Sequence, residues 1–320
     1  FLPTPMGKGV VSDDHPLCTA PARSYALANA DVVLLVGARL NWILHFGQPP
    51  RFATGAKILQ VDIAAEEIGN NVATEVAMVG DAKRVMQQIL EALDDAPFVH
   101  AKDSAWRRGL AESVAKNEAA VEGMMASDAE PMGYYRALRE IRDRLPANTL
   151  LVSEGANTMD ISRTVLPGRE PRTRIDAGTF GTMGVGSGFA IAAAACSPNR
   201  KVVCLQGDSA FGFSGMEVEV ACRVGLPITW IVINNGGIGS GVAASEFDRK
   251  RIPATAYLPD ARYERVIEAF GGRGFYAGSI AELGPALDAA LRSDVPSLVN
   301  VPIDPKATRK AQPFSWLTRS

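Results

Sequence analysis

Apolar positions along this chain form two patterns that alternate with each other. Short continuous apolar runs, such as DVVLLVGA and AKILQVDI, are bounded by polar residues or glycine and predict buried parallel strands. Segments such as ARSYALANA and DAKRVMQQILEAL predict helices, the second through apolar residues at Val85, Ile89, Leu90 and Leu93. Strands that alternate with helices are typical of doubly wound parallel sheets, so an α/β fold is predicted.

The alternation occurs in two regions. Residues 1–95 are predicted to form one domain, residues 96–130 a charged helical linker, and residues 131–320 a second domain with a C-terminal tail. The second region has predicted strands at TLLVSEG, KVVCLQGD, ITWIVINN and SLVNVPID. Its predicted helices are PMGYYRALREIRDRL, GSGFAIAAAAC, GMEVEVACRV, RYERVIEAFG and IAELGPALDAAL. A chain of 320 residues is long enough for two such doubly wound parallel-sheet domains.

Composition narrows the classes of partner. The chain has 33 basic and 35 acidic side chains, a net charge of −2, which gives no sign of a nucleic-acid or membrane-surface partner. No apolar run is long enough to span a bilayer. The four cysteines include no C-x-x-C pair, which favours a reducing, cytoplasm-like compartment. The three histidines are far apart in sequence and indicate no metal cluster.

Two polar motifs follow predicted strands of the second domain. Asp208 in GDSAFGFSG ends the strand KVVCLQGD, and Asn235 ends the strand ITWIVINN. Carboxyl ends of parallel strands meet at the edge where ligands of such sheets bind. A carboxylate and an amide oxygen suit Mg²⁺ that carries phosphates, and a helix beginning near Ser214 or Gly215 would offer its positive end to an anion. Each motif alone could be a turn, but the pair is more specific.

This pair resembles the G-D-x … N-N signature of thiamin diphosphate (ThDP) enzymes, and the resemblance extends over essentially the whole chain. It implies that Asp208, the Asn235 side chain and the Gly237 carbonyl bind Mg²⁺. It also implies that Met183 is a wedge beneath the cofactor that holds its two rings in a V shape. The remaining residues implied to line ThDP are Tyr134, Ala156, Asn157, Thr158, Gly181, Thr182, Ser209, Ala210 and Ile238. Without the resemblance, DAGTFGTMGVGSG could equally be a tight helix–strand contact, and a Met is most often core.

The resemblance implies that the first domain is the family's middle domain. There, Asp62 and Arg39 each follow a predicted strand. A carboxylate at a strand end can accept hydrogen bonds from ribose, and a guanidinium can hold phosphate or stack on adenine, so ADP or a CoA nucleotide is a predicted ligand. No G-x-G-x-x-G accompanies them, which argues against a dehydrogenase and leaves a structural salt bridge equally plausible.

Longer stretches, among them FLPTPMGKGVV and SEGANTMD, resemble the CoA-thioester branch of 2-hydroxyacyl-CoA lyases and oxalyl-CoA decarboxylases. The tail RKAQPFSWLTRS resembles the lyase ending, and Gly239 stands where the family usually has Tyr, which favours the lyase. The resemblance implies reversible cleavage of 2-hydroxyacyl-CoA to an aldehyde or ketone and formyl-CoA, with ThDP as electron sink. Oxalyl-CoA decarboxylase and a non-catalytic ThDP-fold subunit are the alternatives.

The resemblance also implies partners. Asn117 and Arg163 are predicted to contact the CoA-thioester substrate, with help from Lys8 and the tail, although Arg163 could equally be a surface ion-pair member. In the family, the activating Glu stands on a pyrimidine-binding domain that precedes the segment resembling FLPTPMGKG. We therefore expect that domain, with the activating Glu, on an N-terminal pyrimidine-binding fragment of the same enzyme. We also expect a dimeric or tetrameric homo-oligomer, peroxisomal if the source is a eukaryote.

Overall fold

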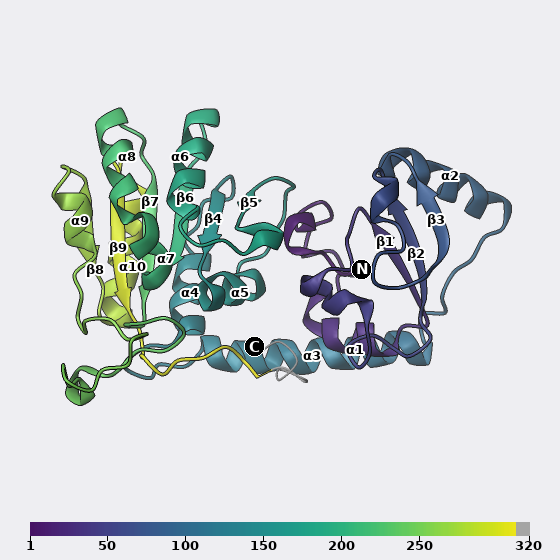
Figure 1. The fold of residues 1–320 in the computed structure, drawn as a ribbon, viewed down its shortest axis with the longest axis horizontal. Coiled ribbons are helices and arrows are strands. Elements are labelled where there is room, and N and C mark those ends of the chain that lie inside the picture. Colours follow the sequence, from purple (N-terminus) through teal and green to yellow (C-terminus); the bar gives the residue numbers. More distant parts are fainter. Residues whose placement is uncertain (312–320) are drawn as a thin grey trace. The chain divides into compact units, whose positions relative to one another are not determined.

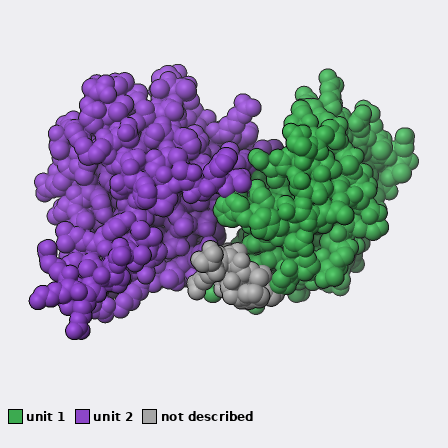
Figure 2. Space-filling view, in the orientation of Figure 1, with its two compact units in different colours: residues 1–4, 19–118, 311–320 green, residues 5–18, 119–310 purple. Residues whose placement is uncertain are grey.

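A computed structural model describes residues 1–311, so the part of the predicted CoA-contacting tail that contains Phe314 and Trp316 lies outside the described residues. The chain divides into two compact units (Figure 2). The first contains Phe1–Thr4 and Thr19–Glu118, and the second contains Pro5–Cys18 and Ala119–Lys310. This division differs from the predicted domain limits of 1–95 and 131–320.

The segment Pro5–Cys18 joins the second unit because it is bonded to a loop there. Asp13 Oδ2 binds Lys8 Nζ at 2.5 Å and accepts the Gly168 amide at 2.8 Å, and Arg169 pairs with Asp14 at 2.6 Å. In place of a continuous helical linker, helix α3 (Ala105–Met125) begins well after residue 96. Its residues fall in both units.

The first unit contains a parallel three-stranded sheet in the order β1-β2-β3 (Figure 1). Its elements are α1 (Arg23–Asn29), β1 (Val32–Val36), β2 (Lys57–Asp62), β3 (Thr74–Val79) and α2 (Ala82–Asp95). Apolar residues from helix, strands and loops form its core: Leu27, Leu35, Leu40, Phe52 and Ile58.

The second unit is built on a parallel six-stranded sheet in the order β5-β4-β6-β7-β9-β8. The strands are β4 (Leu150–Glu154), β5 (Arg174–Ile175), β6 (Val202–Gly207), β7 (Thr229–Asn234), β8 (Arg273–Tyr276) and β9 (Ser297–Pro302). The helices are α4 (Tyr134–Arg142), α5 (Ala156–Val165), α6 (Gly186–Cys196), α7 (Asp208–Ser214), α8 (Val218–Val224), α9 (Glu264–Glu268) and α10 (Ile280–Leu291).

Helices cover both faces of this sheet, which explains why its central strands contain continuous apolar runs. Val203 and Leu205 of β6 pack in the core that includes residues of α4, α5 and α10. Val202 and Cys204 pack in the opposite core, which includes residues of α6, α8 and α9. Both sheets are parallel and flanked by helices, so the predicted α/β class is confirmed.

Several elements differ from the predictions. The strands β3, β5 and β8 and the helix α5 were not predicted. A helix was expected to begin near Ser214 or Gly215. The helix α7 already begins at Asp208, directly after β6, and ends at Ser214. Within residues 1–311, no helix combines the length and the apolar character needed to cross a bilayer.

Candidate functional site

The ends of β4, β6 and β7 form one edge of the second unit's sheet. These strands are neighbours, with Glu154 opposite Gln206 and Gly207 opposite Ile233. Because they are parallel, the residues that follow them lie side by side at their carboxyl ends. Gly155 follows β4, Asp208 follows β6 and Asn235 follows β7.

Asp208 links the ends of β6 and β7. Its Oδ2 accepts the backbone amides of Gly236 at 2.7 Å and Gly237 at 3.1 Å, and its Oδ1 accepts the amide of Ser209 at 2.7 Å. The side chain is buried. The two motifs that were singled out separately in the sequence therefore meet through this carboxylate.

The site is suited to a cation. Burial raises the pKa of Asp208 from 3.8 to about 6, and the amides of Ser209, Gly236 and Gly237 lower the pKa in part. A bound cation would offset the cost of burying the charge. Asn235 donates Nδ2 to the Gly239 carbonyl at 3.1 Å, so its oxygen is the atom that remains to bind a cation. A carboxylate, an amide oxygen and a backbone carbonyl are typical ligands of Mg²⁺.

Within the described residues, no group of three or more His, Cys, Asp or Glu side chains could hold a metal. A metal at this edge therefore depends on the mixed set of Asp208, Asn235 and the Gly237 carbonyl. Only one ligand of that set carries charge, which suits a cation that also binds phosphate oxygens.

The first turns of α4 and α5 contribute two of the predicted residues. Asn157 donates Nδ2 to the Gly239 carbonyl at 3.3 Å, and its side chain bonds the hydroxyl of Tyr134. Burial, together with the nearby charge of Asp208, raises the pKa of Tyr134 to about 12, so it stays a neutral hydroxyl. Ala156 and the buried Thr158 lie on the same turn of α5 as Asn157.

Glycines let the backbones at this edge approach closely. Gly155 has a φ of +94°, and a Cβ placed on it would lie 3.3 Å from the Gly207 nitrogen. A Cβ on Gly237 would lie 2.6 Å from the Ser240 carbonyl oxygen. Glycine at these two positions therefore lets neighbouring backbone segments of the edge pack against each other.

The predicted wedge loop, residues 177–186, is hydrogen-bonded to the same edge. Gly181 has a φ of +62°, and Met183 is half-buried. Glu154, the last residue of β4, accepts hydrogen bonds from the amides of Gly184 and Gly186. The loop that carries Gly181, Thr182 and Met183 is therefore held at the carboxyl end of β4.

Two tyrosines beside Asp208 were missed by the sequence analysis. A cavity of about 430 Å³ is lined by Asp208, Ser209, Gly212, Phe213, Tyr257 and Tyr263. The Tyr257 hydroxyl bonds the Ser209 side chain, and burial and the Asp208 charge raise the pKa of both tyrosines. Tyr257 stands in an irregular segment, and Tyr263 directly precedes α9 in a segment that was predicted only as a helix, so no sequence signal marked either as a site residue.

The two residues predicted to contact CoA are engaged within their own units. Asn117 donates to the Pro21 carbonyl at 2.9 Å. Arg163 binds Asp176 at 2.7 Å and Asp160 at 3.0 Å, and the Asp176 side chain is only 1% exposed. These bonds agree with the ion-pair interpretation of Arg163, and CoA contact stays a prediction for both residues.

The predicted nucleotide residues of the first unit also have local partners. Arg39 lies 3.5 Å from Glu67, and Asp62 Oδ1 accepts the Ala64 amide at 3.0 Å. The Arg39 side chain is more than half exposed. Nucleotide binding by Arg39 and Asp62 stays a prediction.

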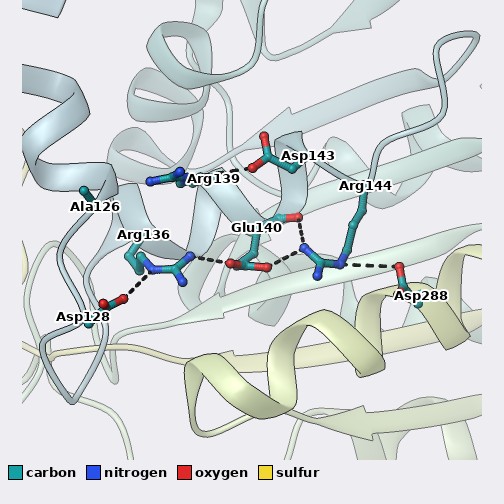
Figure 3. A pocket seen from close by; sticks show the side chains of 8 residues that line it. All are labelled: Ala126, Asp128, Arg136, Arg139, Glu140, Asp143, Arg144 and Asp288. Carbon is teal, nitrogen blue, oxygen red and sulfur yellow. Dashed lines mark hydrogen bonds and ion pairs between the residues drawn. The ribbon is translucent and has the colours of Figure 1, made fainter. Parts of the chain in front are cut away.

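A cavity of about 710 Å³ lies away from the strand ends, over α4 and α10 (Figure 3). Its charged side chains satisfy one another in a row, because Glu140 binds both Arg136 and Arg144. The row ends in Asp128, 3.3 Å from Arg136, and in Asp288, 3.4 Å from Arg144. These pairs join helices of the fold, and the cavity contains none of the predicted site residues.

Two family models match the sequence. "Thiamine pyrophosphate enzyme, C-terminal TPP binding domain" matches residues 154–301, and "Thiamine pyrophosphate enzyme, central domain" matches residues 1–89. The curated "2-hydroxyacyl-CoA lyase 1" of Homo sapiens is 50% identical over 333 residues, which cover 100% of this chain and 58% of that protein.

The protein of the same name from Mus musculus is also 50% identical, over 100% of this chain and 57% of its own length. The "Oxalyl-CoA decarboxylase" of Escherichia coli (strain K12) is 42% identical over 309 residues, or 96% of this chain and 54% of that protein. The chain spans a little more than half the length of these relatives.

Proposed function

This chain belongs to the thiamine pyrophosphate (ThDP) enzymes, whose central and C-terminal domains it carries, and we propose that it binds Mg²⁺ and the diphosphate of ThDP at the edge formed by β4, β6 and β7. The observation that carries the proposal is the contact between the buried Asp208 carboxylate and the Gly236–Gly237 amides. It joins the two segments that carry the three proposed metal ligands, Asp208, Asn235 and Gly237.

Each residue of the edge has a proposed role. The oxygens of Asp208, Asn235 and Gly237 hold the cation, and the Tyr134 hydroxyl, bonded to Asn157, orients the diphosphate. Gly155 lets the turn after β4 pack against Gly207 at the end of β6. Met183 supports the rings of the cofactor. When bound, ThDP supplies the electron sink for carbon–carbon bond cleavage.

The activity that we propose is cleavage of 2-hydroxyacyl-CoA to an aldehyde or ketone and formyl-CoA. Relatives named 2-hydroxyacyl-CoA lyase reach 50% identity, whereas the oxalyl-CoA decarboxylase relative reaches 42%. Gly239 supports the same choice. It has a φ of +81°, and its carbonyl is bonded by Asn157 and Asn235, so a tyrosine in this conformation would be strained. The lack of an aromatic side chain leaves room for a larger acyl substituent.

We propose that a pyrimidine-binding polypeptide and a second copy of the chain complete the enzyme. An apolar surface beside the wedge loop supports this. Phe180 is 95% exposed, Met216 is 67% exposed and Phe213 is 63% exposed. Helix α6 carries no charged side chain and exposes Phe189. Patches of this kind mark protein interaction sites. The four free cysteines support a reducing, cytoplasm-like location.

The experiment combines the chain with a pyrimidine-binding polypeptide made from the N-terminal part of one of the lyase relatives. Formyl-CoA release is then measured from 2-hydroxyacyl-CoA and from oxalyl-CoA, with Mg²⁺ and ThDP present. We expect faster release from 2-hydroxyacyl-CoA. Much faster turnover of oxalyl-CoA would assign the chain to the decarboxylase. Binding of ThDP without turnover of either substrate would favour a non-catalytic subunit.

A further inference from the structure

Glu154 is a buried carboxylate that accepts hydrogen bonds from one end of the wedge loop, defined as residues 177–186, and from the neighbouring strand β6. Its Oε1 accepts the amide of Gly184, and its Oε2 accepts the amide of Gly186 at 2.8 Å and Gln206 Nε2 at 2.7 Å. The residue is 1% exposed. Gly186 is the first residue of α6, so the carboxylate also lies at the positive end of that helix.

The neighbours of Glu154 fix its position in turn. Gln206 stands opposite Glu154 in the sheet, and its Oε1 lies 3.3 Å from the Ser187 hydroxyl. Trp230 Nε1 donates to the same hydroxyl at 3.4 Å. All of these side chains are buried. The carboxylate is therefore held by neutral donors in the core beneath α6, and it has little freedom to turn away from the loop.

Asp176 holds the other end of the wedge loop in the same way. Its Oδ1 accepts the amide of Gly178 at 2.9 Å. Its Oδ2 accepts Arg163 Nη2 at 2.7 Å and Arg163 Nε at 3.2 Å, a two-pronged contact that fixes the carboxylate. Arg163 is anchored on its far side by Asp160, which also binds Arg309 at 2.9 Å.

The loop between the two carboxylates fits this arrangement closely. A Cβ on Gly186 would lie 2.5 Å from Glu154 Oε2 and 2.8 Å from Gln206 Nε2, so only glycine allows the contact. Gly184 has a φ of +89°, which other residues rarely adopt. Phe180, midway along the loop, is 95% exposed, so its side chain does not pack against the fold.

We infer that Glu154 and Asp176 are positioning residues that hold the wedge loop in its final shape before any cofactor arrives. Glu154 fixes the end that leads into α6, and Asp176, oriented by Arg163, fixes the start. Neither touches the proposed metal ligands. The functional meaning rests on the proposed function, because only a ThDP site needs Met183 at a fixed height. A loop that is already ordered spares the cofactor the entropic cost of ordering it.

The test measures hydrogen exchange at single amides of the cofactor-free chain. The variants are Glu154→Gln, Asp176→Asn and the control Glu219→Gln, which alters an exposed carboxylate that pairs with Arg223 on α8. We expect Glu154→Gln to speed exchange at Gly184 and Gly186 by at least about tenfold, and Asp176→Asn to do so at Gly178, as expected for loss of a charge-assisted hydrogen bond. Amides of β6 and β7 and the control variant should keep wild-type rates.

Other outcomes would overturn the inference. Uniform loss of protection across β6 and β7 in Glu154→Gln would show a general structural role. A wild-type loop that is protected only after ThDP is added would show that the cofactor orders the loop. Asp176→Asn acts at the other end of the loop and removes the charge without changing the size of the side chain, so it tests the inference even if Glu154→Gln does not fold.

Calorimetric titration with Mg²⁺ and ThDP separates this inference from the proposed function. We expect ThDP affinity to fall in both variants by about tenfold, the equivalent of one lost hydrogen bond. Wild-type ThDP affinity in variants whose loop amides exchange freely would show that cofactor binding does not depend on the bonds from the loop to Glu154 and Asp176. That result would contradict the proposed role of the two carboxylates. If the wild-type loop is protected but the wild-type chain does not bind ThDP, the cofactor site is disproved, and the inference that Glu154 and Asp176 hold the loop still stands.

Discussion

The carboxylate of Asp208 accepts the backbone amide of Gly236 at 2.7 Å and so joins the ends of two neighbouring strands, β6 and β7, through one buried side chain. Hydrogen bonds from backbone amides offset only part of the cost of burying this charge, so the pKa of Asp208 remains raised to about 6. The same carboxylate is the one charged member of the proposed metal site. Proton binding, cation binding and stability are therefore linked at Asp208.

The first prediction concerns the stability of the cofactor-free chain. The pKa of Asp208 is about 6 in the folded state and 3.8 in the unfolded chain, so the folded state binds the proton more tightly. Its contribution to the free energy of unfolding is present below pH 3.8 and is lost as the pH rises through 6. The loss is about 3 kcal/mol, since one pKa unit corresponds to about 1.4 kcal/mol.

Urea denaturation of the wild type and of Asp208→Asn at several pH values between 3.8 and 6 measures this contribution. The difference in unfolding free energy between the two proteins should change with pH in this window, because the asparagine cannot titrate. Other carboxyl groups titrate in both proteins and cancel in the difference. A difference that does not vary with pH would show that the carboxyl does not titrate with a raised pKa.

The second prediction is that Asp208→Ala abolishes measurable binding of Mg²⁺ and ThDP. The variant removes the one charged ligand, so the loss should exceed the roughly 10–100-fold effect typical of changes to outer-shell partners. Calorimetric titration of ThDP in the presence of Mg²⁺ measures it. The control is Asp294→Ala, which removes an exposed carboxylate between α10 and β9. Unchanged ThDP affinity in Asp208→Ala would disprove the metal-site assignment.

Asp208 and Asn235 could be predicted because each stands at the end of a predicted strand that contains a continuous apolar run, and such runs mark central strands buried on both faces. The strand β5 has two residues, and β8 is a short edge strand, so neither contains enough of a pattern. The hydrogen bond that the Gly186 amide donates to Glu154 could not be predicted. It depends on which face of β4 the side chain takes and on how closely α6 packs, which is decided by tertiary structure.

The third prediction separates the two interpretations of Arg163. Arg163→Gln leaves the nearly fully buried Asp176 carboxylate without its cationic partner, so we expect a loss of about 3 kcal/mol of unfolding free energy. The control Arg169→Gln breaks an exposed pair with Asp14 and should cost less than about 1 kcal/mol. Chemical denaturation compares the two. If Arg163→Gln keeps full stability but raises the KM for the CoA substrate in the completed enzyme, Arg163 contacts CoA instead.

The last prediction concerns activation of the cofactor. Two carboxylates at the ends of β4 and β6 both accept hydrogen bonds from backbone amides. Asp208 accepts the amides that follow β6 and β7, and Glu154 accepts amides of the wedge loop. Asp160 and Asp176 are bonded to Arg163. All four of these carboxylates are thus engaged in bonds within their own unit. We therefore expect the chain alone to bind Mg²⁺ and ThDP weakly and to exchange the C2 proton of ThDP slowly.

Deuterium exchange at C2, followed by NMR after acid quench, measures the rate with and without the pyrimidine-binding polypeptide. Addition of that polypeptide should accelerate exchange, and a polypeptide in which its own glutamate is replaced by glutamine should not. Fast exchange by the purified chain on its own would show that the activating carboxylate belongs to this chain after all.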